Sequence, residues 1–228
     1  RAVAGAQPPA KAPRMSSPRI ALVDYGSGNL RSVAKALARS GLDAEVTADP
    51  QRLFASRAVV LPGVGAFADA VANLGKSGLA DALLRCIASG KPYLGLCLGL
   101  QLLFEEGDEH GVTPGLGLLR GRVERFPDRD AAGALLRVPH IGWNRVHFSG
   151  AHPMLSRLPA ADDFYFVHSY RAVPRDAERI VGRADYGAPF AAAVANANVF
   201  AVQFHPEKSQ RAGKRLLDAF AAWVAESS

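Results

Sequence analysis

The chain has 228 residues and a mass of 24.1 kDa, which suits one large domain or two small ones. Hydrophobic residues make up 49% and charged residues 21% of the sequence, a composition that excludes a wholly disordered, collagenous or coiled-coil protein. The two cysteines, Cys86 and Cys97, are too few for a secreted disulfide framework and favour a reducing, cytoplasmic compartment.

The net charge of +6 is unevenly distributed along the chain. Residues 1–19 hold four basic residues and no acidic one, so the remaining chain carries only +2. We expect residues 1–18, rich in Ala and Pro, to form a disordered tail ahead of one domain at residues 19–228. The folded body shows no basic stripe for nucleic acid, and no run of about 18 apolar residues predicts a membrane span.

The first half of the chain alternates short apolar runs with helical patterns. Strands are predicted at residues 20–23, 44–46, 58–61 and 92–96. Helices are predicted at residues 29–40 and at about 67–88, the second broken near residues 75–78, and a third begins at Cys97. Apolar strands separated by helices indicate a parallel sheet that is buried on both faces.

The second half predicts more strands than helices. Strands are expected at residues 164–170, 180–184, 190–195 and 199–204. The last two are joined by Asn196-Ala197-Asn198, a hairpin signal that favours an antiparallel portion of the sheet. An amphipathic helix at residues 209–225 ends the pattern. Together the two halves predict an α/β protein with a mixed, mostly parallel central sheet.

The strongest local motif is Gly95-Leu96-Cys97-Leu98-Gly99, at the junction of a buried strand and a helix. It has the form of a nucleophile elbow with cysteine in place of serine, where a sharp turn lifts the side chain above the sheet and glycines avoid a clash. The following helix favours the thiolate, and the Leu98 N–H is a natural oxyanion donor. The alternative interpretation is a packed core cysteine.

A thiol nucleophile needs a base that a third group orients. Phe204-His205-Pro206-Glu207 lies at the end of a predicted strand, and such sites gather at the carboxyl ends of parallel strands. His205 is therefore the candidate base, and Glu207 the group that orients its second ring nitrogen. The alternative is a hydrogen-bonded structural histidine. No histidine and cysteine spacing predicts a zinc site.

A third element, Gly63-Val64-Gly65, follows a predicted strand. Glycines there permit unusual backbone angles and bring N–H groups close to a ligand, although an ordinary turn is the alternative. Gly26-Ser27-Gly28 resembles the start of a dinucleotide fingerprint, but Arg31 stands where the third glycine belongs. The sequence therefore does not predict a dinucleotide-binding site, and no cofactor is expected.

These segments together resemble class I (triad-type) glutamine amidotransferases. Within that class the chain is similar to the glutaminase subunits of imidazole glycerol phosphate synthase, an enzyme of histidine biosynthesis. The resemblance rests on six strings that span most of the body: residues 24–30, 61–67, 95–104, 139–144, 164–170 and 203–209. It implies a three-layer fold with a mixed sheet between helices. Leu100 departs from the Met common in the family, a swap of similar volume.

The resemblance implies a catalytic triad of Cys97, His205 and Glu207 that hydrolyses glutamine through a thioester. Leu98 and a backbone N–H from Gly63, Val64 or Gly65 would bind the oxyanion. Residues implied to hold the substrate are Gln101, Glu109, His168, Ser169 and Tyr170. For His168 a structural role is equally compatible with the sequence.

The resemblance also implies a partner, a (β/α)8-barrel cyclase that receives the ammonia in a heterodimer. Residues implied to lie near that partner are Asn29, Pro139, His140, Trp143, Asn144 and Lys208. Trp143 is large and amphipathic, which suits an interface, but core burial is an equal alternative. Lys208 at a helix start is unfavourable against the helix dipole, which suits a carboxylate across an interface.

Other functions remain open on the sequence. A glutaminase for another ammonia acceptor, such as anthranilate or aminodeoxychorismate synthase, would favour His at position 100 and would lack Pro139-His140-Ile141-Gly142-Trp143-Asn144. A freestanding cysteine hydrolase of γ-glutamyl compounds would not need the interface strings. A binding protein without catalysis is disfavoured because Cys97, His205 and Glu207 are all present.

Overall fold

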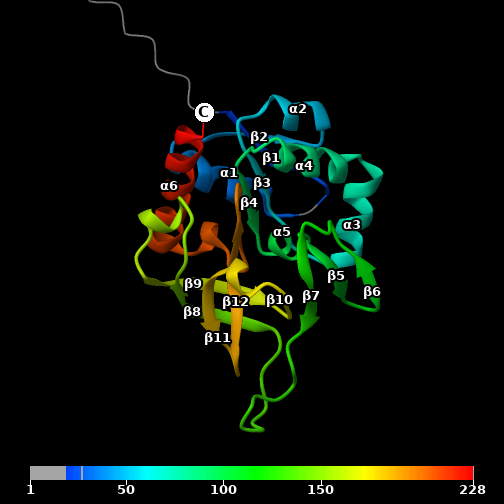
Figure 1. Cartoon of the computed structure of the whole chain (residues 1–228), viewed down its shortest axis with the longest axis vertical. Helices are drawn as coiled ribbons and strands as arrows, with labels where there is room; N and C mark the ends of the chain where they lie inside the picture. Colours follow the sequence, from blue (N-terminus) through cyan, green and yellow to red (C-terminus); the bar gives the residue numbers. More distant parts are fainter. Residues whose placement is uncertain (1–18, 27, 228) are drawn as a thin grey trace, which may run out of the picture.

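The computed structural model describes residues 19–26 and 28–227, so the expected tail at residues 1–18 lies outside the described residues. The main sheet has nine strands in the order β2-β1-β3-β4-β13-β12-β11-β8-β9. Strands from β2 to β13 pair in parallel, and β12, β11, β8 and β9 extend the sheet through antiparallel pairs. Helices flank this sheet, which confirms the predicted three-layer α/β fold with a mixed sheet (Figure 1).

The parallel strands are β1 (Arg19–Val23), β2 (Asp43–Thr47), β3 (Val59–Leu61), β4 (Tyr93–Leu96) and β13 (Val199–Val202). The antiparallel strands are β8 (His140–Phe148), β9 (Ala161–His168), β11 (Ile180–Asp185) and β12 (Pro189–Asn196). The helices are α1 (Leu30–Arg39), α2 (Pro50–Ala55), α3 (Phe67–Lys76), α4 (Leu79–Ala88), α5 (Leu98–Gln101) and α6 (Gln210–Glu226). Short 3-10 turns are η1 (Leu155–Arg157), η2 (Ala177–Arg179) and η3 (Pro206–Lys208).

The three layers follow from the alternation of side chains along the buried strands. In β1, Ile20 and Leu22 join a core cluster with residues of α1 and α6. Ala21 and Val23 point the other way and join a second cluster with residues of α2, α3 and α4. Both faces of the inner parallel strands are thus apolar, which is why their sequences are nearly continuous apolar runs, whereas the edge strand β2 is partly polar and exposed.

The helix boundaries agree closely with the sequence pattern. The predicted break near residues 75–78 is confirmed, because α3 ends at Lys76 and Gly78, with φ 70°, precedes α4. The closing helix α6 buries one face, which confirms its predicted amphipathic character. Helix α2 was not predicted; its start is capped by the Asp49 carboxylate, which accepts a hydrogen bond from the Gln51 N–H.

A second sheet, with the order β10-β7-β5-β6, was also not predicted. It consists of β5 (Phe104–Asp108), β6 (Val112–Pro114), β7 (Leu119–Arg125) and β10 (Tyr170–Pro174). The strand predicted at residues 164–170 is in fact two strands. β9 ends at His168 in the large sheet, and β10 begins at Tyr170 in the small one, so Ser169 is the point where the chain passes between sheets.

The central pairing of β4 with β13 positions the motifs singled out in the sequence. The two strands run parallel, with Leu96 opposite Val202, so their carboxyl ends coincide. Cys97 follows β4 and His205 follows β13, and they therefore meet at one edge of the sheet.

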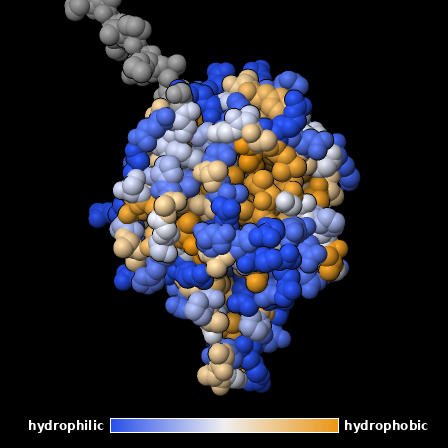
Figure 2. Space-filling view, viewed as in Figure 1, coloured by the Kyte–Doolittle hydropathy of each residue, from blue (hydrophilic) through white to orange (hydrophobic). Residues whose placement is uncertain are grey.

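Polar side chains cover most of the face shown in Figure 2, and the apolar ones visible there gather near its centre. In the part of the chain that the structure describes, no helix is both long and apolar enough to cross a membrane.

Phe164 of β9 and Phe204 stack with ring centroids 3.9 Å apart, and both are fully buried. We expect Phe164→Ala to lower the free energy of unfolding by about 3–5 kcal/mol, because it removes buried area and leaves a cavity. Urea denaturation measures this. Leu135→Ala is the control, since Leu135 is 77% exposed and its loss should change stability by less than about 0.5 kcal/mol. Equal effects of the two variants would contradict this packing argument.

Candidate active site

Cys97 lies in a strained turn between β4 and α5, with φ 53° and ψ −105°. A Cβ on Gly95 would lie 2.5 Å from the carbonyl oxygen of Gly99, and a Cβ on Gly99 would overlap the carbonyl oxygen of Leu61. Only glycine fits on either side of the cysteine, as expected for a nucleophile elbow. The Cys97 N–H donates to the Val202 carbonyl oxygen at 2.8 Å, which ties the elbow to β13.

His205 and Glu207 form a buried pair beside Cys97. Nδ1 of His205 lies 2.8 Å from Oε1 of Glu207, and the two side chains are 3% and 2% exposed. The Asn29 side-chain amide donates to the same carboxylate oxygen at 2.8 Å. Burial lowers the pKa of His205, but its interactions with Cys97 and Glu207 outweigh burial and raise it to about 10. This favours the imidazolium at neutral pH.

The loop at Gly63, Val64 and Gly65 lies against the elbow. A Cβ on Gly63 would lie 2.7 Å from the Cβ of Leu98, so this approach also requires glycine. The Leu98 N–H, expected as an oxyanion donor, points at the Gly63 carbonyl oxygen at 3.4 Å. In this conformation a carbonyl oxygen, and not an N–H group of the loop, faces Leu98.

A cleft of about 440 Å³ opens above Cys97. All five residues that the resemblance implied for substrate binding line it: Gln101, Glu109, His168, Ser169 and Tyr170. Val64, Gly65 and Leu98 of the expected oxyanion site line it as well. Its size and polar lining suit a ligand as small as an amino acid.

Glu109 and Gln101, like other residues of this cleft, also make hydrogen bonds within the protein. Oε2 of Glu109 accepts a hydrogen bond from the Phe67 N–H at 2.7 Å, at the start of α3. Nε2 of Gln101 donates to the Tyr170 carbonyl oxygen and to Oε1 of Gln203, both at 3.0 Å. The Gln101 amide is therefore fixed before any ligand binds.

The residues expected at a partner interface have different surroundings. Pro139 and Lys208 line the cleft, whereas Asn29 bonds to Glu207. His140 is only 3% exposed, so direct contact with a partner is not available to it. Trp143 is 51% exposed, which decides against core burial.

An aromatic and basic surface lies beside the cleft. Trp143 packs edge-on against Tyr165 with centroids 6.2 Å apart, and the ammonium of Lys208 lies 5.8 Å from the Tyr165 ring. Ile141 is 58% exposed and shares the outward face of β8 with Trp143.

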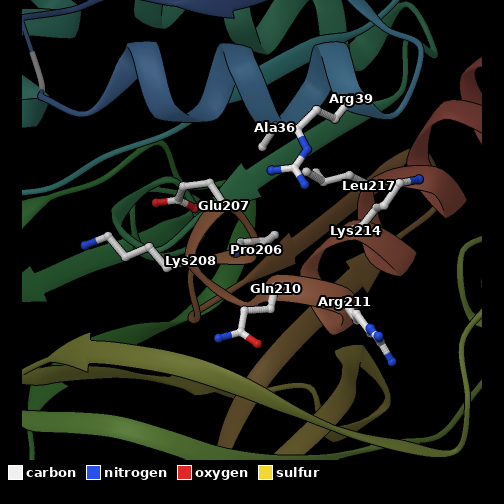
Figure 3. Close-up of a pocket in the computed structure, with 9 residues that line it drawn as sticks. All are labelled: Ala36, Arg39, Pro206, Glu207, Lys208, Gln210, Arg211, Lys214 and Leu217. Carbon is white, nitrogen blue, oxygen red and sulfur yellow. The ribbon is translucent and has the colours of Figure 1, made fainter.

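A groove of about 370 Å³ lies beside Glu207 (Figure 3). Its walls come from α1, η3 and α6, and Glu207 and Lys208 contribute to it. The lining includes four basic side chains, Arg39, Lys208, Arg211 and Lys214, and one acidic side chain, Glu207. Within residues 19–26 and 28–227, no group of three or more metal-binding side chains comes together.

Gln203 is a site residue that the sequence interpretation missed. It is fully buried, and its side-chain Nε2 lies 3.6 Å from Sγ of Cys97. The signal was present in the alternation after β13, since Gln203 and His205 share one side of the chain while Phe204 points to the core.

Comparisons with known proteins identify the family of this chain. The family described as "Glutamine amidotransferase class-I" matches residues 21–223. "Imidazole glycerol phosphate synthase subunit HisH" of Methylococcus capsulatus is 53% identical over 214 residues, which cover 92% of this chain and 98% of that protein. The protein of the same name from Moorella thermoacetica is 50% identical over 205 residues, covering 90% of this chain and 95% of that protein.

Solved structures of lower sequence identity share the fold. PurLQS from Thermotoga maritima aligns with a TM-score of 0.71 at 21% identity, over 91% of this chain and 99% of that one. The glutaminase domain of Trypanosoma brucei CTPS aligns with a TM-score of 0.64 at 18% identity, over 91% and 94% of the two chains.

The chain belongs to the class I glutamine amidotransferases and, within that class, to the HisH family of imidazole glycerol phosphate synthase subunits. It is a glutamine-hydrolysing enzyme.

The geometry of the elbow requires glycine at position 99, and this requirement can be tested. We expect Gly99→Ala to abolish alkylation of Cys97 by iodoacetamide, because the new methyl group would displace the elbow from the Leu61 carbonyl. Gly75→Ala is the matched control, because a Cβ at this position of α3 meets nothing within 4 Å. Alanine also has a higher helix propensity than glycine, so the stability of this variant should be equal to or higher than that of the wild type, and Cys97 should be labelled normally. Peptide mass spectrometry after labelling measures the modification, and normal labelling of Gly99→Ala would contradict the steric argument.

Proposed function

We propose that this chain is the glutaminase subunit of imidazole glycerol phosphate synthase and supplies ammonia for histidine biosynthesis. The observation that carries the proposal is the meeting of Cys97, His205 and Glu207 next to a cleft of amino-acid size, which Cys97 lines. Relatives named HisH, about 50% identical over nearly the whole chain, support the same role. A cytoplasmic location is part of the proposal.

The triad geometry supports thioester chemistry. The Cys97 thiolate attacks the carboxamide carbon of glutamine, and the oxyanion accepts hydrogen bonds from backbone N–H groups. The imidazolium of His205 gives its proton to the leaving nitrogen as the C–N bond breaks, which releases ammonia and leaves a γ-glutamyl thioester. His205 then takes a proton from water, the hydroxide attacks the thioester, and the C–S bond breaks to give glutamate. Glu207 holds His205 through Nδ1 in both steps.

The loop conformation supports a resting state of low activity. The Leu98 N–H is directed at the Gly63 carbonyl oxygen, so it is not available to an oxyanion in this conformation. Rotation of the peptide between Gly63 and Val64 would remove that carbonyl and present an N–H in its place. Glycine at positions 63 and 65 permits this rotation, and Gly65 already has φ 105°.

The surface formed by Ile141, Trp143, Tyr165 and Lys208 supports docking of a (β/α)8-barrel cyclase. Exposed aromatic residues and a cation next to the cleft are typical of interface anchors. We propose that ammonia passes from the cleft to this partner, which uses it to convert phosphoribulosyl-formimino-AICAR-phosphate into imidazole glycerol phosphate and AICAR. The same proposed side of the molecule includes Asn29, Pro139, His140 and Asn144. Of these, His140 is buried and would act from beneath the surface.

Glutamate release from glutamine tests the proposal. We expect strong activity only when the chain is mixed with the cyclase and the nucleotide substrate of the cyclase, and none in any mixture with Cys97→Ala. Equal activity with and without the cyclase would refute the histidine-pathway role and favour another ammonia acceptor or a freestanding γ-glutamyl hydrolase. Activity that persists in Cys97→Ala would refute the thioester mechanism.

Lys208 tests the docking surface. We expect Lys208→Ala to reduce stimulation by the cyclase and its nucleotide about tenfold, because a charge-assisted interface contact is lost, while the melting temperature stays unchanged. Lys35→Ala, which removes an exposed lysine of α1, is the control and should leave stimulation intact. Unchanged stimulation in Lys208→Ala would exclude this residue from the coupling.

A further inference from the structure

The Gln203 side chain connects the nucleophile to a buried polar network. Its Nε2 donates toward Sγ of Cys97 at 3.6 Å, within the range of an N–H···S hydrogen bond, and the residue is fully buried. A donor aimed at sulfur stabilises the thiolate relative to the thiol, because the charged form is the stronger acceptor. Gln203 and His205 therefore approach the same sulfur from one strand end.

The Gln203 amide has only one favourable orientation. Its Oε1 accepts a hydrogen bond from Nε2 of Gln101 at 3.0 Å, and the same Gln101 nitrogen donates to the Tyr170 carbonyl oxygen at 3.0 Å. Because a carbonyl can only accept, the Gln101 nitrogen must face it. The Gln203 oxygen then faces Gln101, and its NH₂ group is left for the sulfur.

The network continues from Tyr170 through two buried histidines. Nδ1 of His168 lies 2.8 Å from the Tyr170 carbonyl oxygen and so carries a proton. Nε2 of His168 then accepts from Nδ1 of His140 at 3.0 Å, and Nε2 of His140 accepts from the Asn144 side-chain amide at 3.3 Å. Every donor points in the same direction along this segment.

Both imidazoles must be neutral for this arrangement to hold, because a second ring proton would face another donor. Burial lowers the pKa of His140 to about 4, and burial, with smaller effects of the neighbouring histidines, lowers the pKa of His168 to about 3. The network is thus uncharged at neutral pH, unlike the imidazole of His205 beside it.

We propose that Gln203 is a positioning residue that orients and stabilises the Cys97 thiolate, and that its amide is held by a buried hydrogen-bond chain through Gln101, Tyr170, His168 and His140 to Asn144. The chain begins on β8, on the side of the molecule proposed to meet the cyclase, and ends at the reacting sulfur. The inference rests on the proposed function, because it takes Cys97 as the nucleophile.

Several other titratable groups surround the sulfur and belong to both the wild-type and variant proteins. His205 comes from the end of β13, and Glu109, Tyr170, Lys208 and His168 line the cleft with Cys97. A substitution at Gln203 leaves all of these in place, so a change in thiol reactivity reports on the amide itself.

The test is the pH dependence of Cys97 alkylation by iodoacetamide in the full chain, followed by peptide mass spectrometry that separates Cys97 from Cys86. Gln203→Met keeps the length of the side chain but removes the donor. We expect it to move the alkylation midpoint to higher pH and to lower the rate at pH 7 about tenfold, in line with losing a hydrogen bond to a charged group. Gln51→Met, at an exposed position of α2, is the matched control and should leave both unchanged.

Gln203→Glu gives a second test that keeps the shape of the side chain if the methionine variant does not fold. It retains an acceptor for Gln101 but places a carboxyl oxygen against the sulfur, so the alkylation midpoint should rise further. A midpoint equal to that of the wild type in a folded Gln203 variant would overturn the positioning role. This assay needs neither glutamine nor cyclase, so failure of cyclase-stimulated glutaminase activity would refute the proposed function without deciding this result.

Asn144→Asp tests the far end of the chain. The substitution replaces the donor to Nε2 of His140 with a carboxylate, which should raise the pKa of His140. The imidazole NMR signals of His140 should then titrate above pH 5 in the variant. In the wild type they should not titrate above pH 5. The Cys97 alkylation rate should fall by less than in Gln203→Met. Unchanged His140 titration together with unchanged alkylation would overturn the chain beyond His168.

Discussion

The parallel pairing of β4 with β13 is the constraint on which the site depends. It sets Leu96 opposite Val202, so the residues that follow the two strands emerge at one edge. A further hydrogen bond, from the Cys97 N–H to the Val202 carbonyl oxygen at 2.8 Å, fixes the elbow to the strand that His205 follows. Residues about 100 positions apart in the sequence thus meet without any contribution from loop flexibility.

The crowding around the elbow explains why small residues cluster there. Gly63, Gly95 and Gly99 lie where a methyl group would meet Leu98, Gly99 or Leu61. Close packing of three backbone segments holds the cysteine side chain at the cleft. The strained φ of 53° at Cys97 is maintained by this packing, which is a common arrangement where a nucleophile must be held in place.

Much of this could be predicted from the sequence, because its strongest signals are local. Apolar runs and helical periodicity gave the parallel core, and the elbow glycines marked Cys97. The small sheet was missed because strands such as β7 bury only Leu119 and Val123 among polar residues. The division of residues 164–170 at Ser169 depends on pairing with β7, which is a long-range contact that no local pattern contains.

The roles of buried polar residues were equally hard to predict. His140 and His168 resemble surface or catalytic histidines in sequence, yet they are buried, neutral and bonded to each other at 3.0 Å. Gln203 is next to the motif that contains His205 and Glu207, and the sequence pattern assigns no role to it. Its contact with the Cys97 sulfur depends on the orientation of the Gln101 amide. Such networks are set by tertiary geometry and become visible only when the segments are brought together.

The carbonyl of Gly63 facing the Leu98 N–H has a consequence for nitrogen economy. Ammonia is a diffusible product, and glutamine is a shared donor for many biosynthetic reactions. Under the proposed function, a subunit whose oxyanion site is closed by its own backbone could be made in excess of its partner without draining the glutamine pool. In that proposal, the Gly63 carbonyl oxygen would link nitrogen release to the presence of an acceptor.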